Sequence, residues 1–264
     1  RSATAARPAT AYSELDLSGE YALTSPKAKT RAKIMLPGDV HTALLEAGEI
    51  PDPYFGANEQ VVMWVHDTPW AMERRFTASA SDIDGYLTLT LENVDCIATI
   101  ILNGEAVAHT QNQFIRYDID VTGKVRAGTN TLRLEFAVTK DVAKARADAH
   151  PFPIPFTYNY VTNGLPGVHM NFVRKTACHA GWDWGICLMP TGVYGRMAIR
   201  RSRLARQESV QVEQAHGKNS VELSLTTRIF AFADGSVELT HEIAGQKLAD
   251  EVAVRQGENF FVHN

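Results

Sequence analysis

Alternation of apolar and polar residues with period two constrains the fold of this chain more than any other feature. It recurs over eight segments: 86–91, 98–102, 131–136, 193–199, 210–212, 221–225, 237–243 and 251–254. Side chains two residues apart on a strand lie on the same face of a sheet, so the pattern predicts strands that are buried on one face. The chain is therefore expected to be all-β.

Turn and helix signals divide these strands. Asn103-Gly104 separates two apolar runs and predicts a tight hairpin, because both residue types tolerate positive φ. A short helix is expected over about 40–47, with Asp39 capping its first turn and Gly48 ending it. Residues 141–149 are compatible with a second short helix.

The stretch 151–172 contains no Asp, Glu, Lys or Arg and is long enough to raise the question of a membrane span. Pro151, Pro153, Pro155 and Pro166 exclude a continuous helix there, so we expect a long ordered loop. The formal net charge of -4 provides no broad cationic field, which argues against nucleic acid and membrane partners. A neutral partner fits the composition better.

Near residue 199 the alternating apolar pattern gives way to a polar, basic run, and this change predicts a domain boundary. Arg200, Arg201, Arg203 and Arg206 suggest a solvated basic linker rather than an anion site. We expect a disordered or extended N-terminus over 1–12, one β-sandwich over 13–202, and a second over 203–264. The second region supplies about five strands, fewer than the seven of an immunoglobulin-like sandwich, so it is expected to be truncated or built of short strands.

Cysteine and histidine spacing predicts neither a metal site nor a cofactor. Cys178 and Cys187 could form one disulfide, or could be buried thiols, which the composition favours. His169, Cys178, His179 and Cys187 fit no compact zinc pattern. Nucleotide-binding and serine-hydrolase motifs are absent from the sequence.

The densest group of unusual residues lies over 171–185. Trp182 and Trp184 supply flat apolar faces for a pyranose ring, and Asp183 supplies a hydrogen-bonding carboxylate. In an extended strand the two tryptophans point to one face and Asp183 to the other, so all three meet one sugar only if the chain bends. The alternatives are tryptophans packed in the core, and Asp183 paired structurally with Arg174 or Lys175.

No catalytic pair is assigned from the sequence. Asn58-Glu59 follows an aromatic segment and is interpreted as part of a structured loop rather than as a general acid. The 30 acidic residues are too many for a catalytic dyad to be chosen by composition alone.

The order of several motifs resembles the amino-terminal region of β-mannosidases of glycoside hydrolase family 2. The match runs from about residue 15 to residue 201, and its motifs are LPGDVHTALL (36–45), IPDPYFGANE (50–59), Trp64, Trp70, LNG (102–104), NQF (112–114), YDIDVT (117–122) and NFVRKTACHAGWDWG (171–185). Residues 185–187 depart from the Gly-Pro that usually follows the last motif.

The resemblance implies a jelly-roll, galactose-binding-like β-sandwich followed by part of an immunoglobulin-like sandwich. It also implies that a (β/α)₈ barrel with the two catalytic glutamates belongs to a further region, so that this chain alone is inactive. Asp183 would bind hydroxyls of a terminal mannose, Trp182 and Trp184 would shape that wall, and Arg174 would orient Asp183. The partners would be mannosides, held in a site shared with the barrel.

Two alternatives to the β-mannosidase interpretation stay open. The chain could be a free-standing carbohydrate-binding module, or the same region of a galactosidase or glucuronidase, because sandwich domains are shared more widely than their sites. A periplasmic or secreted location is favoured over a cytoplasmic one. The oligomeric state is not indicated by the sequence.

Overall fold

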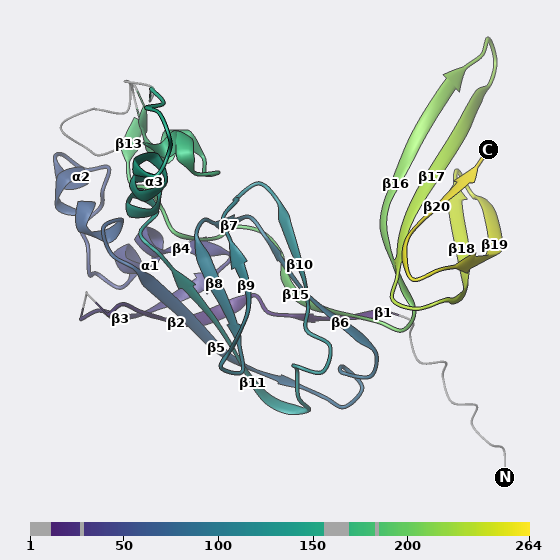
Figure 1. Ribbon diagram of the computed structural model, residues 1–264, viewed down its shortest axis with the longest axis horizontal. Coiled ribbons are helices and arrows are strands. Elements are labelled where there is room, and N and C mark those ends of the chain that lie inside the picture. The colour runs from purple at the N-terminus through teal and green to yellow at the C-terminus, as the bar shows by residue number, and fades with distance from the viewer. Residues whose placement is uncertain (1–11, 27–28, 156–168, 183–184) are drawn as a thin grey trace. The chain divides into compact units, whose positions relative to one another are not determined.

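The computed structural model describes residues 12–26, 29–155, 169–182 and 185–264 (Figure 1). Their contacts divide them into two compact units. The first unit comprises 14–83 and 87–200, and the second comprises 201–264 together with 84–86 and the described residues 12–13. The predicted domain limits stay a prediction, as does the predicted N-terminal segment, of which residues 1–11 lie outside the described residues.

Two sheets form the β-sandwich of the first unit. One has six strands in the order β3-β2-β5-β11-β8-β9, and the other has four in the order β1-β15-β6-β10. Their bounds are Tyr12–Asp16 (β1), Gly19–Thr24 (β2), Arg31–Leu36 (β3), Trp70–Ala78 (β5), Tyr86–Glu92 (β6), Ala98–Leu102 (β8), Glu105–Thr110 (β9), Arg116–Asp120 (β10), Gly128–Phe136 (β11) and Met197–Ser202 (β15). The all-β prediction is confirmed.

Alternating side chains of the two sheets build the core. Leu132 and Leu134 of β11 are fully buried, as are the leucines of β6. Strand β6 departs from the prediction of one buried face, because Thr88 and Thr90 on its other side are buried as well. Thr90 accepts a hydrogen bond from Arg200 Nε at 2.6 Å, which satisfies this hydroxyl away from water.

The predicted strand over 193–199 is wrong, because the chain changes sheet within it. β14 (Gly192–Val193) lies between β4 (Gly38–Asp39) and β7 (Val94–Asp95) in a small three-stranded sheet, whereas β15 belongs to the sandwich. Gly195 makes the change possible: its amide bonds to Glu92 O at 3.2 Å, and a Cβ there would lie 2.7 Å from Glu92 Cβ. Only glycine fits so close an approach.

The predicted basic linker is also wrong at its start, because Arg200 and Arg201 belong to β15 and are each only 5% exposed. Arg200 pairs with Asp118 at 2.6 Å, and Arg201 donates to Ser13 Oγ at 2.8 Å. These partners compensate the burial of the two guanidinium groups.

Helices gather at one end of the first unit (Figure 1). They are α1 (Val40–Glu46), α2 (Asn58–Val61) and α3 (Thr139–Asp148), with 3-10 turns η1 (Met63–Val65), η3 (Met170–Phe172) and η4 (Ala177–His179). Asp39 caps α1 and Gly48 follows it with φ of 70°, as predicted. The expected long loop falls mostly on 156–168, outside the described residues, and its end forms η3.

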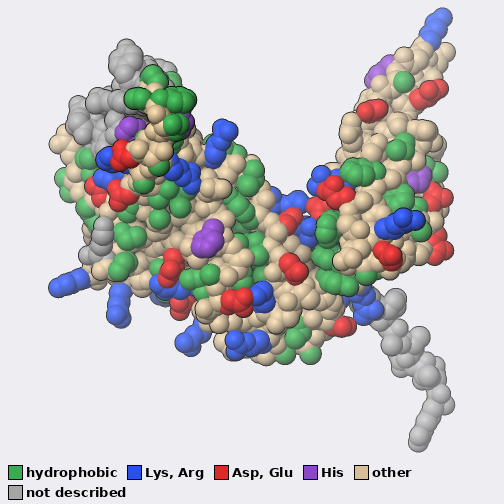
Figure 2. Space-filling model, in the orientation of Figure 1, with side chains coloured by type: hydrophobic (Ala, Val, Ile, Leu, Met, Phe, Trp, Pro, Cys, Tyr) green, Lys and Arg blue, Asp and Glu red, His purple; other side chains and the backbone are tan. Residues whose placement is uncertain are grey.

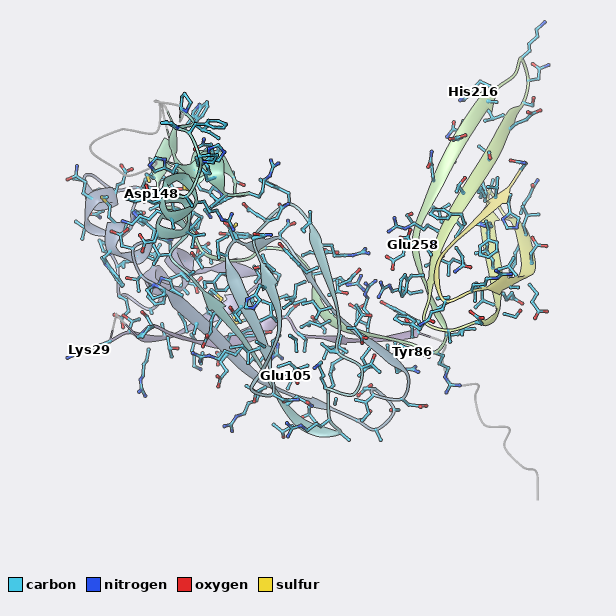
Figure 3. All side chains as sticks on the ribbon, viewed as in Figure 1. Lys29, Tyr86, Glu105, Asp148, His216 and Glu258 are labelled. Atoms are coloured by element: carbon cyan, nitrogen blue, oxygen red, sulfur yellow. The ribbon has the colours of Figure 1, made fainter. Side chains whose placement is uncertain are left out.

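The second unit contains β16 (Ala205–His216), β17 (Val221–Ala231), β18 (Gly235–Ile243), β19 (Gln246–Val254) and β20 (Gly257–His263). They form a three-stranded sheet, β16-β17-β20, and a two-stranded sheet, β18-β19. His216, at the end of β16, pairs with Val221, whereas β20 pairs with β17 only as far as Leu225, so the β16-β17 ribbon extends beyond β20 (Figure 3). Buried Ile229, Ala231, Leu239 and Val254 form its core.

The described helices are all too short or too polar to cross a bilayer. Charged side chains of both signs are interspersed over the face shown in Figure 2.

Candidate functional site

A two-stranded hairpin carries the Trp-Asp-Trp segment. β12 (Ala180–Trp182) pairs antiparallel with β13 (Gly185–Cys187), with Trp182 opposite Gly185. The residues that connect the two strands are Asp183 and Trp184, both outside the described residues. A Cβ at position 185 would lie 3.3 Å from Trp182 Cβ, so glycine permits the close pairing at this end.

The hairpin rests on a small core of its own, separate from that of the sandwich. Its buried members come from α3, from η3 and the hairpin strands, and from the residues just after these two elements: Ala143, Met170, Val173, Ala180, Cys187 and Met189. The base of the hairpin is closed by a hydrogen bond from Met189 N to His179 O at 2.8 Å. The described parts of the segment are thus a packed element of the first unit.

A cavity of about 1280 Å³ adjoins this hairpin. Trp182 and Ile186 line it from the hairpin, Tyr54 and Glu59 from the 53–59 loop and α2, and His41 from α1. Tyr54 is 76% exposed and Trp182 is half-buried, so each leaves part of an aromatic surface uncovered. Such faces suit the apolar side of a sugar ring.

The ionisable groups of the cavity include the carboxylates of Asp39 and Glu59 and the imidazoles of His41 and His179. Asp39 and Glu59 line it, and its described lining contains no Lys or Arg. Burial lowers the pKa of His41 to about 4, so its imidazole is uncharged near neutral pH. These groups can exchange hydrogen bonds with hydroxyls, and the described lining offers no Lys or Arg to an anionic ligand.

A buried ion pair lies beneath the hairpin. Lys175 Nζ donates to Asp95 Oδ2 at 2.5 Å and to Pro190 O at 2.6 Å, and both side chains of the pair are almost completely buried. His179 Nδ1 lies 3.5 Å from the same carboxylate oxygen. Burial lowers the pKa of Lys175, and Asp95 opposes that shift. The Lys175 ammonium, which precedes the hairpin, therefore links Asp95 of β7 with Pro190, which follows the hairpin.

Of the four predicted sugar-binding residues, the structure brings Trp182 to the cavity. Asp183 and Trp184 lie outside the described residues, and their roles stay predictions. Arg174 is exposed and does not belong to the described cavity lining; its carbonyl accepts the Gln113 amide at 2.8 Å. The predicted action of Arg174 on Asp183 also stays a prediction, whereas Lys175 is engaged by Asp95.

Sequence reasoning missed the other residues of this region. Asn58-Glu59 was interpreted as part of a structured loop, which is wrong for these two residues, because they begin α2. The segment before them is a loop, in which Asp52 Oδ1 accepts the Tyr54 amide at 2.9 Å. Its position on the cavity was not expected. Neither Asp95 nor Lys175 carried a signal, because their partnership spans 80 residues.

The three cysteines are free thiols in the structure, so the disulfide alternative is not realised. Cys187 is buried as predicted, whereas the prediction that Cys178 is buried is wrong, because Cys178 is exposed. Burial raises the pKa of Cys96 to about 11 and that of Cys187 to about 12, which keeps both protonated and unreactive. Within the described ranges, no group of three His, Cys, Asp or Glu side chains is arranged to hold a metal ion.

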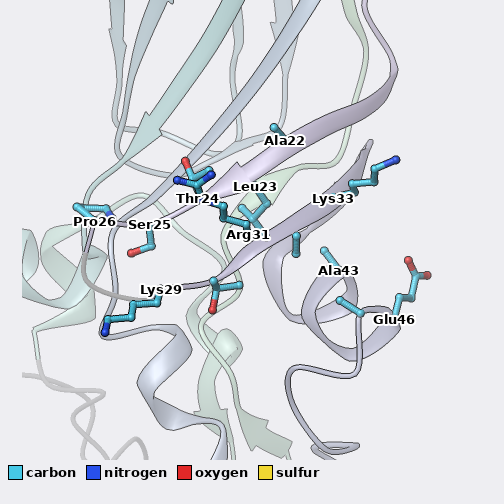
Figure 4. Close-up of a pocket in the computed structure, with 13 residues that line it drawn as sticks. Ala22, Leu23, Thr24, Ser25, Pro26, Lys29, Arg31, Lys33, Ala43 and Glu46 are labelled. Atoms are coloured by element: carbon cyan, nitrogen blue, oxygen red, sulfur yellow. The ribbon is translucent and has the colours of Figure 1, made fainter.

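A second cavity, of about 930 Å³, lies between the β2-β3 pair and α1 (Figure 4). Lys29, Arg31 and Lys33 line it, and Lys33 pairs with exposed Glu20 at 2.9 Å. Its described lining has no aromatic side chain and none of the predicted sugar-binding residues. Charged side chains on an edge strand also protect it from pairing with other chains, which accounts for these residues. The hairpin cavity is therefore the better candidate site.

Comparisons with known proteins agree with the fold. The family model described as glycosyl hydrolase 2 galactose-binding domain-like matches residues 21–195. A probable β-mannosidase of Caenorhabditis elegans is 28% identical over 236 residues, covering 87% of this chain and 26% of that protein. The β-mannosidase of Bos taurus is 30% identical over 198 residues, covering 72% and 22%.

A solved β-D-mannosidase from Dictyoglomus thermophilum superposes with a TM-score of 0.85 at 26% identity, over 95% of this chain and 30% of that one. The chain thus spans about a quarter of the length of the relatives it matches. The resemblance noted in the sequence is confirmed, as is the predicted jelly-roll sandwich. Because the family model covers most of the first unit, the chain belongs to the galactose-binding domain-like family of glycosyl hydrolase 2.

Proposed function

We propose that this chain is the amino-terminal, non-catalytic region of a retaining exo-β-mannosidase that releases terminal non-reducing β-D-mannose. The observation that supports the proposal is the hairpin cavity, which is lined by Trp182, the residue before Asp183 in the sequence, within a chain whose relatives are named β-mannosidases. The region supplies one wall of the mannose subsite, and the rest of the site belongs to a barrel domain.

This division of labour has a chemical reason. Retaining hydrolysis requires two carboxyl groups about 5 Å apart on rigid supports, which barrel strands provide. A binding wall can still accelerate the reaction, because energy gained from sugar hydroxyls supports distortion at the reacting carbon. The chain alone is therefore proposed to be inactive, to bind mannosides and neither nucleic acid nor membranes, and to act in the periplasm or outside the cell.

The decisive experiment is Asp183→Ala in the longer enzyme that contains this region. Turnover of a p-nitrophenyl β-mannoside should fall by a factor of about 100 or more, the loss expected when a group that binds the reacting sugar is removed. Asp148→Ala, at an exposed position on α3, serves as the control and should behave as wild type. Near wild-type kinetics for Asp183→Ala would refute the assignment.

The charge of the cavity supports a mannoside rather than a uronide. A glucuronide carries a carboxylate, and the described lining offers it Asp39 and Glu59 but no cation. Residues 156–168 and 183–184 add one Asp and no Lys or Arg. The same enzyme should therefore discriminate strongly against a p-nitrophenyl β-glucuronide, and comparable rates on the two substrates would favour a glucuronidase.

One observation favours a second candidate, a free-standing carbohydrate-binding module: the cavity is formed within the first unit alone. Titration calorimetry of the 264-residue chain with mannose and mannobiose separates the two. Part of a subsite should bind in the millimolar range at best, whereas submicromolar binding would identify an independent module.

A further inference from the structure

His179 stands where the cavity lining meets the buried ion pair. It ends η4 and lines the hairpin cavity together with Trp182. Its side chain is 26% exposed, whereas the side chain of Asp95, which it contacts, is fully buried. The imidazole therefore has one side in the cavity and the other in the packed interior.

The inner side of this ring carries Nδ1. The nitrogen is enclosed, and Asp95 Oδ2 lies 3.5 Å from it. This distance is longer than a normal hydrogen bond, so the interaction is mainly electrostatic. An unprotonated Nδ1 would turn its lone pair toward the carboxylate and be repelled, whereas a protonated Nδ1 turns a partly positive hydrogen toward it. The contact therefore favours the neutral tautomer that has its proton on Nδ1.

Asp95 can impose this tautomer because it is itself held in place. Its backbone belongs to β7, where it pairs with Gly192 of β14. Lys175 Nζ donates to Asp95 Oδ2 at 2.5 Å and to Pro190 O at 2.6 Å, so one carboxylate oxygen faces both the ammonium and the imidazole. Interactions between charges are stronger away from water. The carboxylate thus has little freedom to turn away from the ring.

The main chain of His179 is fixed as well. Its amide donates to Thr176 O at 3.2 Å, and its carbonyl accepts the Met189 amide at 2.8 Å. With the backbone bonded on both sides and Nδ1 facing a fixed carboxylate, few orientations of the ring remain. A polar group that is oriented in advance loses little entropy when a ligand binds to it.

Nε2 is the nitrogen of this ring that is left for a ligand. Among the described residues none bonds to it, and unlike Nδ1 it is not enclosed. In the Nδ1–H tautomer it carries a lone pair, so it accepts a hydrogen bond from a hydroxyl. Trp182, on the same cavity, offers an apolar face to a pyranose ring. An acceptor beside an aromatic face is the combination that a neutral sugar requires.

We propose that His179 is a sugar-binding residue of the hairpin cavity: its Nε2 accepts a hydrogen bond from one hydroxyl of the mannoside, and Asp95 is the positioning residue that fixes the tautomer. This inference rests on the proposed function, because it names a further contact in the same site. The sequence spacing excluded His179 as a zinc ligand and did not indicate a contact with sugar.

The first measurement needs no ligand. The ¹⁵N chemical shifts of the His179 ring, recorded on the 264-residue chain, show which nitrogen carries the proton. We expect Nδ1–H, whereas free histidine prefers Nε2–H. The signal is assigned by its loss in His179→Gln. An Nε2–H tautomer in the neutral ring would overturn the proposal, because a protonated Nε2 cannot accept a hydrogen bond.

The second measurement uses the longer enzyme that contains this region. His179→Ala removes the ring, His179→Asn keeps a polar group at the reach of Nδ1, and His179→Gln keeps one at the reach of Nε2. His109→Ala is the matched control, because His109 is an exposed histidine of β9 outside the cavity lining. For p-nitrophenyl β-mannoside, kcat/KM should fall about tenfold in His179→Ala and His179→Asn, less in His179→Gln, and stay unchanged in His109→Ala. Melting temperatures establish that each variant is folded.

Deoxy substrates distinguish a direct contact from a structural effect. Four monodeoxy mannosides, which lack in turn the hydroxyl of C2, C3, C4 or C6, are compared in wild type and in His179→Ala. Loss of one of these hydroxyls should cost about tenfold less in the variant than in wild type, because its partner is already gone. If His179→Ala does not fold, His179→Asn takes its place, since it keeps the inner polar group.

The outcomes separate this contact from the function on which it rests. If the enzyme hydrolyses the β-mannoside and all four deoxy losses are the same in wild type and variant, His179 does not touch the sugar, and the proposed function stands. If the wild-type enzyme does not hydrolyse the β-mannoside at all, the proposed function fails and the sugar contact falls with it.

Discussion

Lys175 and Asp95 form an ion pair whose side chains are 1% and 0% exposed. Replacing Lys175 by Met leaves the carboxylate buried without its counter-charge, so we expect the free energy of unfolding to fall by about 3–5 kcal/mol. Urea denaturation measures the change. Lys144→Met is the control: Lys144 pairs with Asp148 at 2.7 Å in an exposed position, and its loss should cost about 0.5 kcal/mol or less. Equal losses in the two variants would contradict this account.

His41 makes the stability of the first unit depend on pH. Burial lowers its pKa from 6.5 to about 4, so between these values the unfolded chain binds a proton that the folded chain does not. Stability is therefore lost as pH falls below about 6.5, by about 2 kcal/mol at pH 5. His41→Gln should lose less stability than wild type between pH 7.5 and pH 5, whereas exposed His109→Gln should follow wild type in urea titrations. If the stability of His41→Gln falls with pH as steeply as that of wild type, His41 is not the cause of the pH dependence.

Sequence reasoning succeeded where the partners of a residue are close in the chain. Asp39 was predicted to cap α1, and its Oδ1 accepts the Thr42 amide only three residues away, at 3.1 Å. The pairing of Lys175 with Asp95 depends on the tertiary fold, which local patterns do not encode. Trp182 was predicted from the unusual composition of the 171–185 segment, and the role of Asp183 stays a prediction.

The β8-β9 hairpin illustrates how backbone conformation fixes an element. Asn103 has φ of 53° and Gly104 has φ of 86°, the positive values that the Asn-Gly signal predicts. No atom would lie within 4 Å of a Cβ at position 104, so a substitution there changes backbone strain alone. Gly104→Val should destabilise the chain by about 1–2 kcal/mol, and Gly104→Asn by clearly less, because Asn tolerates positive φ. Thermal unfolding of both variants decides, and equal losses would count against the turn assignment.

The predictions for individual strands failed where polar side chains are buried because they bond to one another. Thr90 in β6 and Arg200 in β15 are polar, yet both are buried because Arg200 bonds to Thr90 and to Asp118. The period-two pattern reports one face of a strand and says nothing about such a network on the other. For the same reason the arginines near residue 200 suggested a solvated linker.

At the scale of the molecule, the motif order predicted the sandwich and its family, because it samples the chain from residue 36 to residue 185. The small sheet β4-β14-β7 was not predicted, since strands of two residues are too short to show periodicity. This sheet bears Asp39 and Asp95, and so it connects the sandwich to the cavity and to the ion pair beneath the hairpin.

The cores of the two units differ enough to predict how the chain divides. The first unit holds the large core of the sandwich, whereas the core cluster of the second has four buried apolar residues, and Val212, Val221 and Leu248 of that unit are about half exposed. A folded chain of about 60 residues is marginally stable even with a full core. We therefore expect 12–202 to fold alone and to melt cooperatively within a few degrees of the full chain, and 203–264 alone to show no cooperative transition by circular dichroism. Loss of cooperative melting in 12–202 would show that the core of the sandwich does not suffice for folding. A sharp transition in 203–264 would show that the smaller core does.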